Sequence, residues 1–381
     1  MAARYAWVSV DARTGIVIAD LPDLDVGSVS VALCQYQSTT ATLPVPTAPE
    51  NWLRATLPGA ACLVLLRQQI DAFGNFVDIA LPIWGGLITQ RTRTEGDTVD
   101  LSLVTLEKYL DRRYVGTVTF TNTDQNTIIQ TLVNTYVADG ATPGIPIRVQ
   151  KIGTGTVSTR TYMDADDKTV YSALTEIAGT DGGSEWTIGW EHLSSPERYR
   201  PVLFVSNRLG SPVTGDAPNA TFDIPGPVTA VQFVENYGDD AGANDVMAVS
   251  TATGNVRPQS PHQNAGDPIR PTFEKRYTPS TSISDIATLT AHAVAALAML
   301  ANGSTSVSLS AAEVSAPAVG VDWVIGDDVG FEIGGLDANL MDLVPSFPHG
   351  VGGVGRAIGW TLNLGETAII EPVITGVQIG A

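Results

Sequence analysis

The chain has 381 residues, 44% of them hydrophobic, and a formal net charge of −19 from 40 acidic and 21 basic residues. A chain of this length usually divides into several domains, and the apolar fraction is sufficient to give them buried cores. The acidic balance, without a cluster of lysine or arginine, disfavours nucleic-acid binding because nothing would neutralise a run of phosphates.

Residues 1–115 are predicted to form successive strands. No apolar stretch of signal-peptide length precedes Asp11, so no secretory signal is expected. "GSVSVALCQYQ" (27–37) alternates at period two, "TEGD" (94–97) suits a turn between strands, and "LEKYLDRR" (106–113) suits a short closing helix. This succession favours a small barrel or sandwich, and we expect a first β-barrel domain here.

Helical patterns enter between residues 116 and 210. Asp124 is placed to cap a helix over 125–138, whose apolar residues fall on one face. A second helix is expected from Lys168 to Ala178, with Asp166 or Asp167 as its N-cap and Gly179 at its end. Together with strands over 144–153, 184–192 and 200–207, these helices predict a central α/β domain.

A Pro/Gly-rich linker is expected at 211–227, followed by a second β-barrel domain over 228–381. That domain contains a proline-rich loop at 257–279 and a helix at about 284–302, which Gly303 ends. The apolar face assigned to this helix consists of Ile286, Leu289, Ala293, Val294, Leu297 and Leu300. The predicted fold class is therefore α+β: mainly β, with two barrel-like domains flanking an α/β domain.

The most conspicuous polar group is the acidic cluster Asp164, Asp166 and Asp167. A calcium loop needs regularly spaced oxygen ligands, a central glycine and a terminal bidentate glutamate, and this segment runs directly into a helix. We therefore interpret the cluster as helix capping. Other acidic turns, at Asp327–Asp328 and at Asp20, Asp23 and Asp25, also lack ligand spacing and are predicted to be solvated.

Glu185 lies beside Trp186, and a carboxyl group against an aromatic ring can act as the acid of a glycosidase. Such an enzyme needs a second carboxylate across a cleft, which the sequence does not place. The simpler interpretation is a turn leading into a strand on which Trp186, Ile188 and Trp190 share one buried face.

Motifs for nucleotide, metal or nucleophilic chemistry are absent from the sequence. Cys34 and Cys62 form no metal or disulfide pattern and are interpreted as buried thiols. "GVGGVGRAIG" (350–359) leads into a strand, so it lacks the helix N-terminus that would hold phosphate. We predict no catalytic, cofactor-binding or metal-binding residues, and a protein that is not an enzyme. The four histidines are scattered: His192, His262, His292 and His349.

The central segment resembles the corresponding domain of minor tail proteins from long-tailed phages of actinobacteria. The resemblance rests on "TNTDQNTIIQTLVNTYV", "GIPIRV", "TRTYMDADDKTVYSALTEIAGTDGGSEWTIGW" and "RPVLFVSNRLG". In that group a capped helix, a strand, a "Lys-Thr-Val" helix and a "Gly-Gly-x-Glu-Trp" turn follow in this order. Its members are similar to tail-tip hubs of other long-tailed phages and to the baseplate hub of contractile tails.

This resemblance implies a structural virion protein of the phage tail tip, assembled in the host cytoplasm. It implies a homotrimer of two barrels per chain, forming a ring between the six-fold tail tube and a three-fold tip and passing DNA on ejection. The implied partners are the distal tail protein ring, the tape-measure protein, a central tip or fibre and other minor tail proteins. No membrane-spanning segment is expected, because 284–302 is too short and polar.

Two other interpretations stay open at this stage. The chain is alternatively a distal tail ring subunit, or a receptor-binding or cell-wall-binding minor tail protein whose tryptophans stack on sugars. The third interpretation is a peptidoglycan hydrolase that uses Glu185 and an aspartate.

Overall fold

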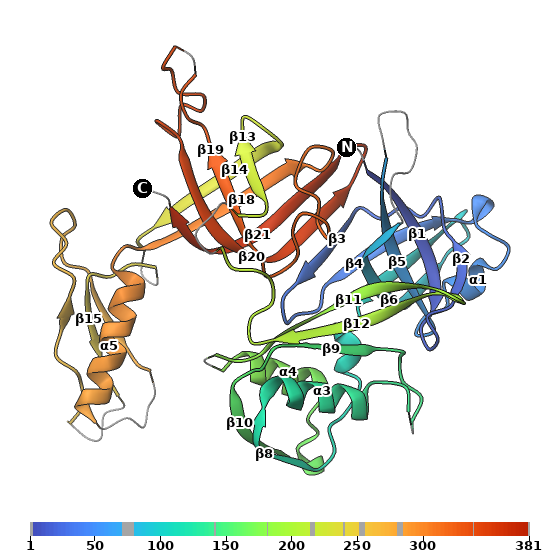
Figure 1. Ribbon diagram of the computed structural model, residues 1–381, viewed down its shortest axis with the longest axis horizontal. Coiled ribbons are helices and arrows are strands. Elements are labelled where there is room, and N and C mark those ends of the chain that lie inside the picture. The colour runs from blue at the N-terminus through green and yellow to red at the C-terminus, as the bar shows by residue number, and fades with distance from the viewer. Residues whose placement is uncertain are drawn as a thin grey trace. The chain divides into compact units, whose positions relative to one another are not determined.

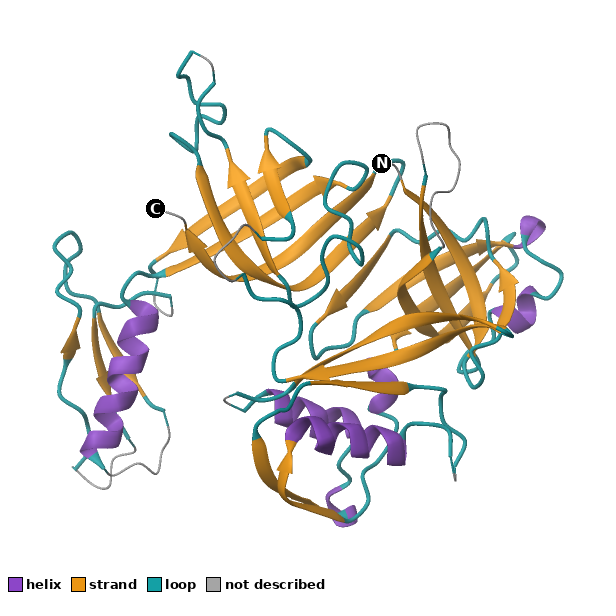
Figure 2. Cartoon of the chain, in the orientation of Figure 1, coloured by secondary structure: helices purple, strands orange, loops and turns teal. Residues whose placement is uncertain are grey.

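The structure is a computed structural model and describes residues 3–70, 80–140, 142–180, 182–213, 218–238, 241–250, 256–279, 285–337 and 339–379. The chain is mainly β with several sheets, one of them a half-barrel, and is α+β as predicted (Figures 1 and 2). It forms two compact units: unit 1 comprises 1–231 and 308–381, and unit 2 comprises 232–307.

The first sheet of unit 1 has six antiparallel strands in the order β2-β1-β5-β6-β7-β4. The predicted turn at 94–97 joins β6 to β7, and the predicted short helix follows β7 as α2. The elements are β1 (Ala3–Asp11), β2 (Val17–Asp20), β4 (Ser38–Pro44), η1 (Val45–Thr47), α1 (Trp52–Ala55), β5 (Ala61–Gln69), β6 (Leu81–Arg93), β7 (Thr98–Thr105) and α2 (Glu107–Leu110).

The segment after α2 contains both predicted helices. In the three-stranded sheet β11 pairs antiparallel with β12, and β12 pairs parallel with β9; β8 and β10 form a separate ribbon. The elements are β8 (Val118–Asp124), α3 (Gln125–Tyr136), β9 (Arg148–Ile152), β10 (Val157–Tyr162), η2 (Asp164–Asp166), α4 (Val170–Ala178), β11 (Glu185–Ser194) and β12 (Glu197–Ser206).

Helix α3 begins where the sequence predicts. The Asp124 carboxylate accepts hydrogen bonds from the backbone N–H groups of Asn126 (3.3 Å) and Thr127 (3.2 Å), which lack partners inside the helix. The predicted apolar face is fully buried at Ile128, Ile129, Leu132, Val133 and Val137, whereas Tyr136 on the same face is only partly buried.

The predicted cap of helix α4 is wrong. Asp166 belongs to the 3-10 turn η2, and Asp167 has a left-handed φ of 47°, so neither occupies the cap position. The cap is Thr169, whose hydroxyl accepts from Ser172 N at 3.1 Å and donates to Asp111 Oδ1 at 3.0 Å. Gly179 ends the helix as predicted.

Replacing Thr169 by alanine is therefore expected to lower the free energy of unfolding by about 1–2 kcal/mol, because an N–H group of the first turn loses its acceptor. The exposed Asp166→Ala change should alter it by less than about 0.5 kcal/mol. Urea denaturation of both variants measures the difference, and a larger effect at Asp166 would contradict the capping assignment.

The second sheet of unit 1 contains the C-terminal strands in the order β13-β19-β20-β21-β18-β14. A strand from the N-terminal part of the chain, β3 (Ser28–Ala32), also joins it and pairs antiparallel with the second half of β20. The glycine-rich stretch at 350–359 was predicted to lead into a strand; strand β20 already begins within it, at Val351. The elements are β13 (Thr221–Ile224), β14 (Val228–Asn236), β18 (Ser304–Ala312), β19 (Asp328–Ile333), β20 (Val351–Leu364) and β21 (Ala368–Ile379).

Unit 2 consists of a small sheet and one helix. Leu289 and Ala293, on the predicted apolar face of the helix, are fully buried and pack with Val246 of β15. Ile286 and Val294, which were assigned to the same buried face, are instead 56% and 51% exposed. The predicted helix start at Ser284 lies outside the described residues. The elements are β15 (Asp245–Ala248), β16 (Gln263–Asn264), β17 (Glu274–Tyr277) and α5 (Ile286–Leu300).

Candidate functional site

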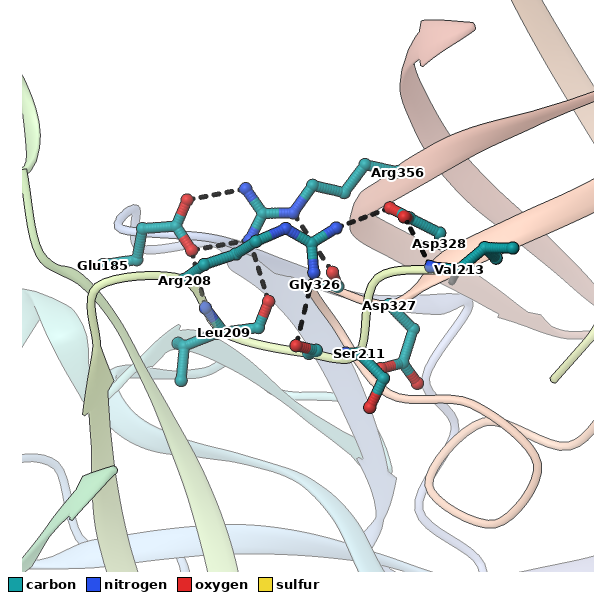
Figure 3. A network of polar contacts seen from close by, with 10 residues as sticks. Glu185, Arg208, Leu209, Ser211, Val213, Gly326, Asp327, Asp328 and Arg356 are labelled. Carbon is teal, nitrogen blue, oxygen red and sulfur yellow. Dashed lines mark hydrogen bonds and ion pairs between the residues drawn. The ribbon is translucent and has the colours of Figure 1, made fainter. Parts of the chain in front are cut away.

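Glu185, the residue that sequence analysis considered for acid catalysis, lies in a network of polar contacts within unit 1 (Figure 3). It is the first residue of β11, and Arg356 of β20 reaches it with both terminal nitrogens. The Oε1–Nη1 distance is 2.6 Å and the Oε2–Nη2 distance is 2.5 Å. Leu209 N donates to Oε2 at 2.8 Å. This bidentate geometry is the strongest arrangement open to an arginine and a carboxylate.

Arg356 also binds the backbone on either side of this pair. Its Nε donates to the Gly326 carbonyl at 3.1 Å and its Nη2 donates to the Leu209 carbonyl at 2.9 Å. The hydrogen bonds to Glu185 raise the pKa of Arg356 above its already high usual value. One guanidinium therefore joins β11, the segment after β12 and the turn before β19.

The acidic turn at Asp327 and Asp328 completes the network. Arg208 Nη2 lies 2.5 Å from Asp328 Oδ1. Asp327, only 5% exposed, accepts from Ser211 N at 2.6 Å and Val324 N at 2.8 Å. The prediction that these two aspartates form a solvated turn is thus wrong, because they hold the 208–213 connection against the second sheet. Asp20, Asp23 and Asp25 are exposed, as predicted.

This network does not suit acid catalysis. A glycosidase acid must hold a proton near an open cleft, whereas both Glu185 oxygens already accept charge-assisted hydrogen bonds. Trp186 is fully buried, and Ile188 and Trp190 pack in the same core, as the core-packing interpretation predicts. The geometry of Glu185 is that of a structural ion pair.

Glu107, at the start of α2, is a buried carboxyl group that sequence analysis missed. Its side chain is 2% exposed, and its Oε1 accepts from Ile188 N of β11 at 3.1 Å. Its Oε2 has no hydrogen-bond partner within the described ranges. Burial raises its pKa to about 7, although hydrogen bonds from Thr105 and Ile188 act in the opposite direction. Glu107 thereby links the first sheet to the edge of β11.

A buried ion pair, also unpredicted, links β5 with the residue that follows β18. Arg67 donates to Glu313 Oε1 at 2.9 Å, and the two side chains are only 4% and 6% exposed. Burial, with the charge of Glu313, raises the pKa of the Tyr5 hydroxyl beside them. Unit 1 thus joins its sheets through three carboxylates: Glu107 and Glu313, which are buried, and Glu185, whose side chain is 18% exposed.

The remaining candidate groups have structural surroundings. Burial raises the pKa of Cys62 to about 12 and that of the half-buried Cys34 to about 11, so neither thiol ionises readily. His262 lies 2.5 Å from Asp245, and the described part of the chain contains no cluster of metal-binding side chains. Five tryptophans are buried: Trp7, Trp84, Trp186, Trp323 and Trp360.

Comparison of the sequence with family models and with curated proteins finds no match. Comparison of the fold with solved structures finds several matches. A tail protein from Neisseria meningitidis MC58 matches with a TM-score of 0.55 over 98% of this chain and 97% of that one, at 13% sequence identity. The 43 kDa tail protein of prophage MuSo2 from Shewanella oneidensis matches with a TM-score of 0.52 over 97% and 98%, at 9% identity.

The chain has a tail-protein fold. This fold also occurs in a chain of the lidded Francisella PdpA–VgrG complex, with a TM-score of 0.54 and 8% identity over 98% of this chain and 53% of that one. Among the described residues, no helix is long and apolar enough to cross a bilayer. The structural similarity to phage tail proteins that the sequence motifs indicate is thus confirmed at the level of the fold.

Proposed function

We propose that this chain is the hub of a phage tail tip. In this proposal three copies form a ring that joins the six-fold tail tube and distal tail ring to a three-fold tip, and DNA passes through it on ejection. The hub domains are those predicted over 1–115 and 228–381, with the 116–210 domain between them. The protein is a virion component without catalytic activity of its own.

The full-length agreement with the Neisseria tail protein is the observation that carries this proposal, since 98% of one chain superposes on 97% of the other. The ion pairs Glu185–Arg356 and Arg67–Glu313 support it because they link the sheets of unit 1.

The acidic composition also has a use in this role. Three copies would carry three times the chain's formal charge of −19. A lumen of the same sign as DNA repels the phosphate backbone, so the DNA would not adhere during ejection. Partners at the tail tip are the distal tail ring, the tape-measure protein and a central tip or fibre.

The experiment is mass determination by light scattering, combined with electron microscopy of tails labelled on this protein. We expect three copies at the tail tip. A hexameric ring would favour a distal tail subunit, and binding to cell-wall fragments would favour a receptor-binding role. Clearing of cell-wall material that Glu185→Gln abolishes would establish a hydrolase and overturn the proposal.

A further inference from the structure

A small cavity lies in unit 1 where strands from three sheets meet. Its wall includes Ile83 of β6 in the first sheet, Val31 of β3 in the second sheet and Ile188 of β11 in the three-stranded sheet. Its volume is about 10 Å³, and a single water molecule needs about 10–15 Å³ of such space. The cavity is therefore of a size to take one water molecule or one ion, and no larger ligand.

Glu107 brings an unpaired carboxyl oxygen to this cavity. The residue is 2% exposed and lines the cavity, and its Oε1 already accepts from Ile188 N at 3.1 Å. Its Oε2 has no hydrogen-bond partner within the described part of the chain. A buried polar atom without a partner costs free energy, and such atoms in folded proteins commonly bond to internal water. The cavity therefore offers a ligand the hydrogen bond that the protein itself does not supply.

The ligand that suits Glu107 must be able both to donate and to accept a hydrogen bond. Burial raises the pKa of this carboxyl group to about 7, so it carries a proton below neutral pH and a negative charge above it. The protonated form can donate from Oε2, whereas the ionised form only accepts. Water serves both forms. A metal cation serves only the ionised form, and calcium would need about six to eight oxygen ligands where the cavity offers a single carboxylate.

Thr105 and Gln35 supply the further partners that a buried water needs, since both line the cavity. Thr105 Oγ1 accepts from Gln37 N at 3.0 Å, and its hydroxyl also bonds to Glu107, which leaves one lone pair for another donor. The Gln35 carboxamide can donate and accept, and this residue is exposed to solvent. A buried water makes about three hydrogen bonds, and these three side chains can supply them.

We infer that this cavity binds one water molecule, which is held by Glu107 Oε2 and forms part of the joint between β3, β6 and β11. The site goes beyond the hub function and does not depend on it. The water gives the carboxyl group a partner in both of its protonation states. Because Gln35 lines the cavity and is also exposed, its side marks the route by which the water and the proton of Glu107 exchange with solvent.

A crystal structure of the full wild-type chain, at a resolution that shows ordered water, tests the site directly. We expect one peak of density in the cavity, about 2.5–3.0 Å from Glu107 Oε2, which is the distance of a hydrogen bond between two oxygens. A cavity without density would overturn the inference. A peak at about 2.3–2.6 Å that is surrounded by six or more oxygen ligands would identify a cation, and would overturn it as well.

Oxygen-17 relaxation dispersion, which counts long-lived bound water in solution, gives a second test. Glu107→Leu should lose one such water relative to the wild type, because leucine has a similar size and no hydrogen-bonding group. Glu107→Gln can still donate and accept and should keep it. The matched control, Glu366→Leu at an exposed residue, should also keep it. Equal counts in the wild type and a folded Glu107→Leu variant would reject the site, and the wild-type crystal structure decides the question if that variant does not fold.

The same count at about pH 5 and about pH 9 tests the dual role of the water. We expect the wild type to keep it at both values, since it accepts from the protonated carboxyl group at the lower pH and donates to the carboxylate at the higher one. Loss of one long-lived water at the lower pH would show that the ligand needs the negative charge, which contradicts the inference.

Discussion

Replacing Arg356 by alanine is expected to lower the free energy of unfolding by about 3 kcal/mol. The change removes both charged hydrogen bonds to Glu185 and leaves a carboxylate that is only 18% exposed without its cation. Breaking such a pair costs more than the pair itself contributes, because the remaining charge stays poorly solvated. The carbonyl groups of Gly326 and Leu209 lose their donor as well.

Denaturant titration followed by tryptophan fluorescence measures this loss. The matched control is Arg13→Ala, which removes a 64% exposed arginine lying 4.0 Å from Asp139 and should cost less than about 0.5 kcal/mol. Adding Glu185→Gln to Arg356→Ala should recover part of the stability, since the unpaired charge is then gone. Equal effects of Arg356→Ala and Arg13→Ala would mean that the network of Figure 3 contributes little.

The second large effect concerns pH. The pKa of Glu107 is raised from 4.5 to about 7 in the folded chain, so the folded state holds this proton more tightly than the unfolded state. The stability linked to Glu107 is therefore fully present below pH 4.5 and is lost as the pH rises through 7. A shift of this size corresponds to about 3 kcal/mol.

Glu107→Gln should accordingly be more stable than the wild type at pH 9, by up to about 3 kcal/mol, and close to it at pH 4. Glutamine keeps an oxygen that accepts from Ile188 N but carries no charge at either pH. The exposed Glu366→Gln change serves as the control and should leave the pH profile unchanged. Parallel wild-type and Glu107→Gln profiles between pH 4 and 9 would contradict the buried-carboxyl interpretation.

Local patterns in the sequence predicted local structure well. The spacing of apolar residues located α3 and α4. The capping role of Asp124 could be predicted because its carboxylate accepts from backbone N–H groups two and three positions further along. Alternating residues and turn signals likewise located β6, β7, β11 and β12. These helices, caps and strands are determined by residues within a few positions of one another, so local periodicity and capping signals are enough to predict them.

The α4 cap was misplaced by only a few positions, on Asp166 or Asp167 instead of Thr169. The other errors and omissions arise where the partner is distant. Glu185 and Arg356 are 171 positions apart, and Arg67 and Glu313 are 246 apart, so no spacing rule relates them. Asp327 resembles a solvated turn residue until the 208–213 connection covers it. Val294 has the hydropathy of a core residue, yet among the described residues of α5 it lies away from Leu289 and Ala293, which pack in unit 2.

The pairing of β3 with β20 has a consequence for how the protein is made. Ser30 and Thr361 bond across this pair although 331 positions separate them. At about 5–20 residues per second, a ribosome needs tens of seconds to supply the second strand after the first. During that time the edge of β3 has no strand beside it. A prematurely terminated chain never acquires that strand, so its edge stays open to indiscriminate pairing.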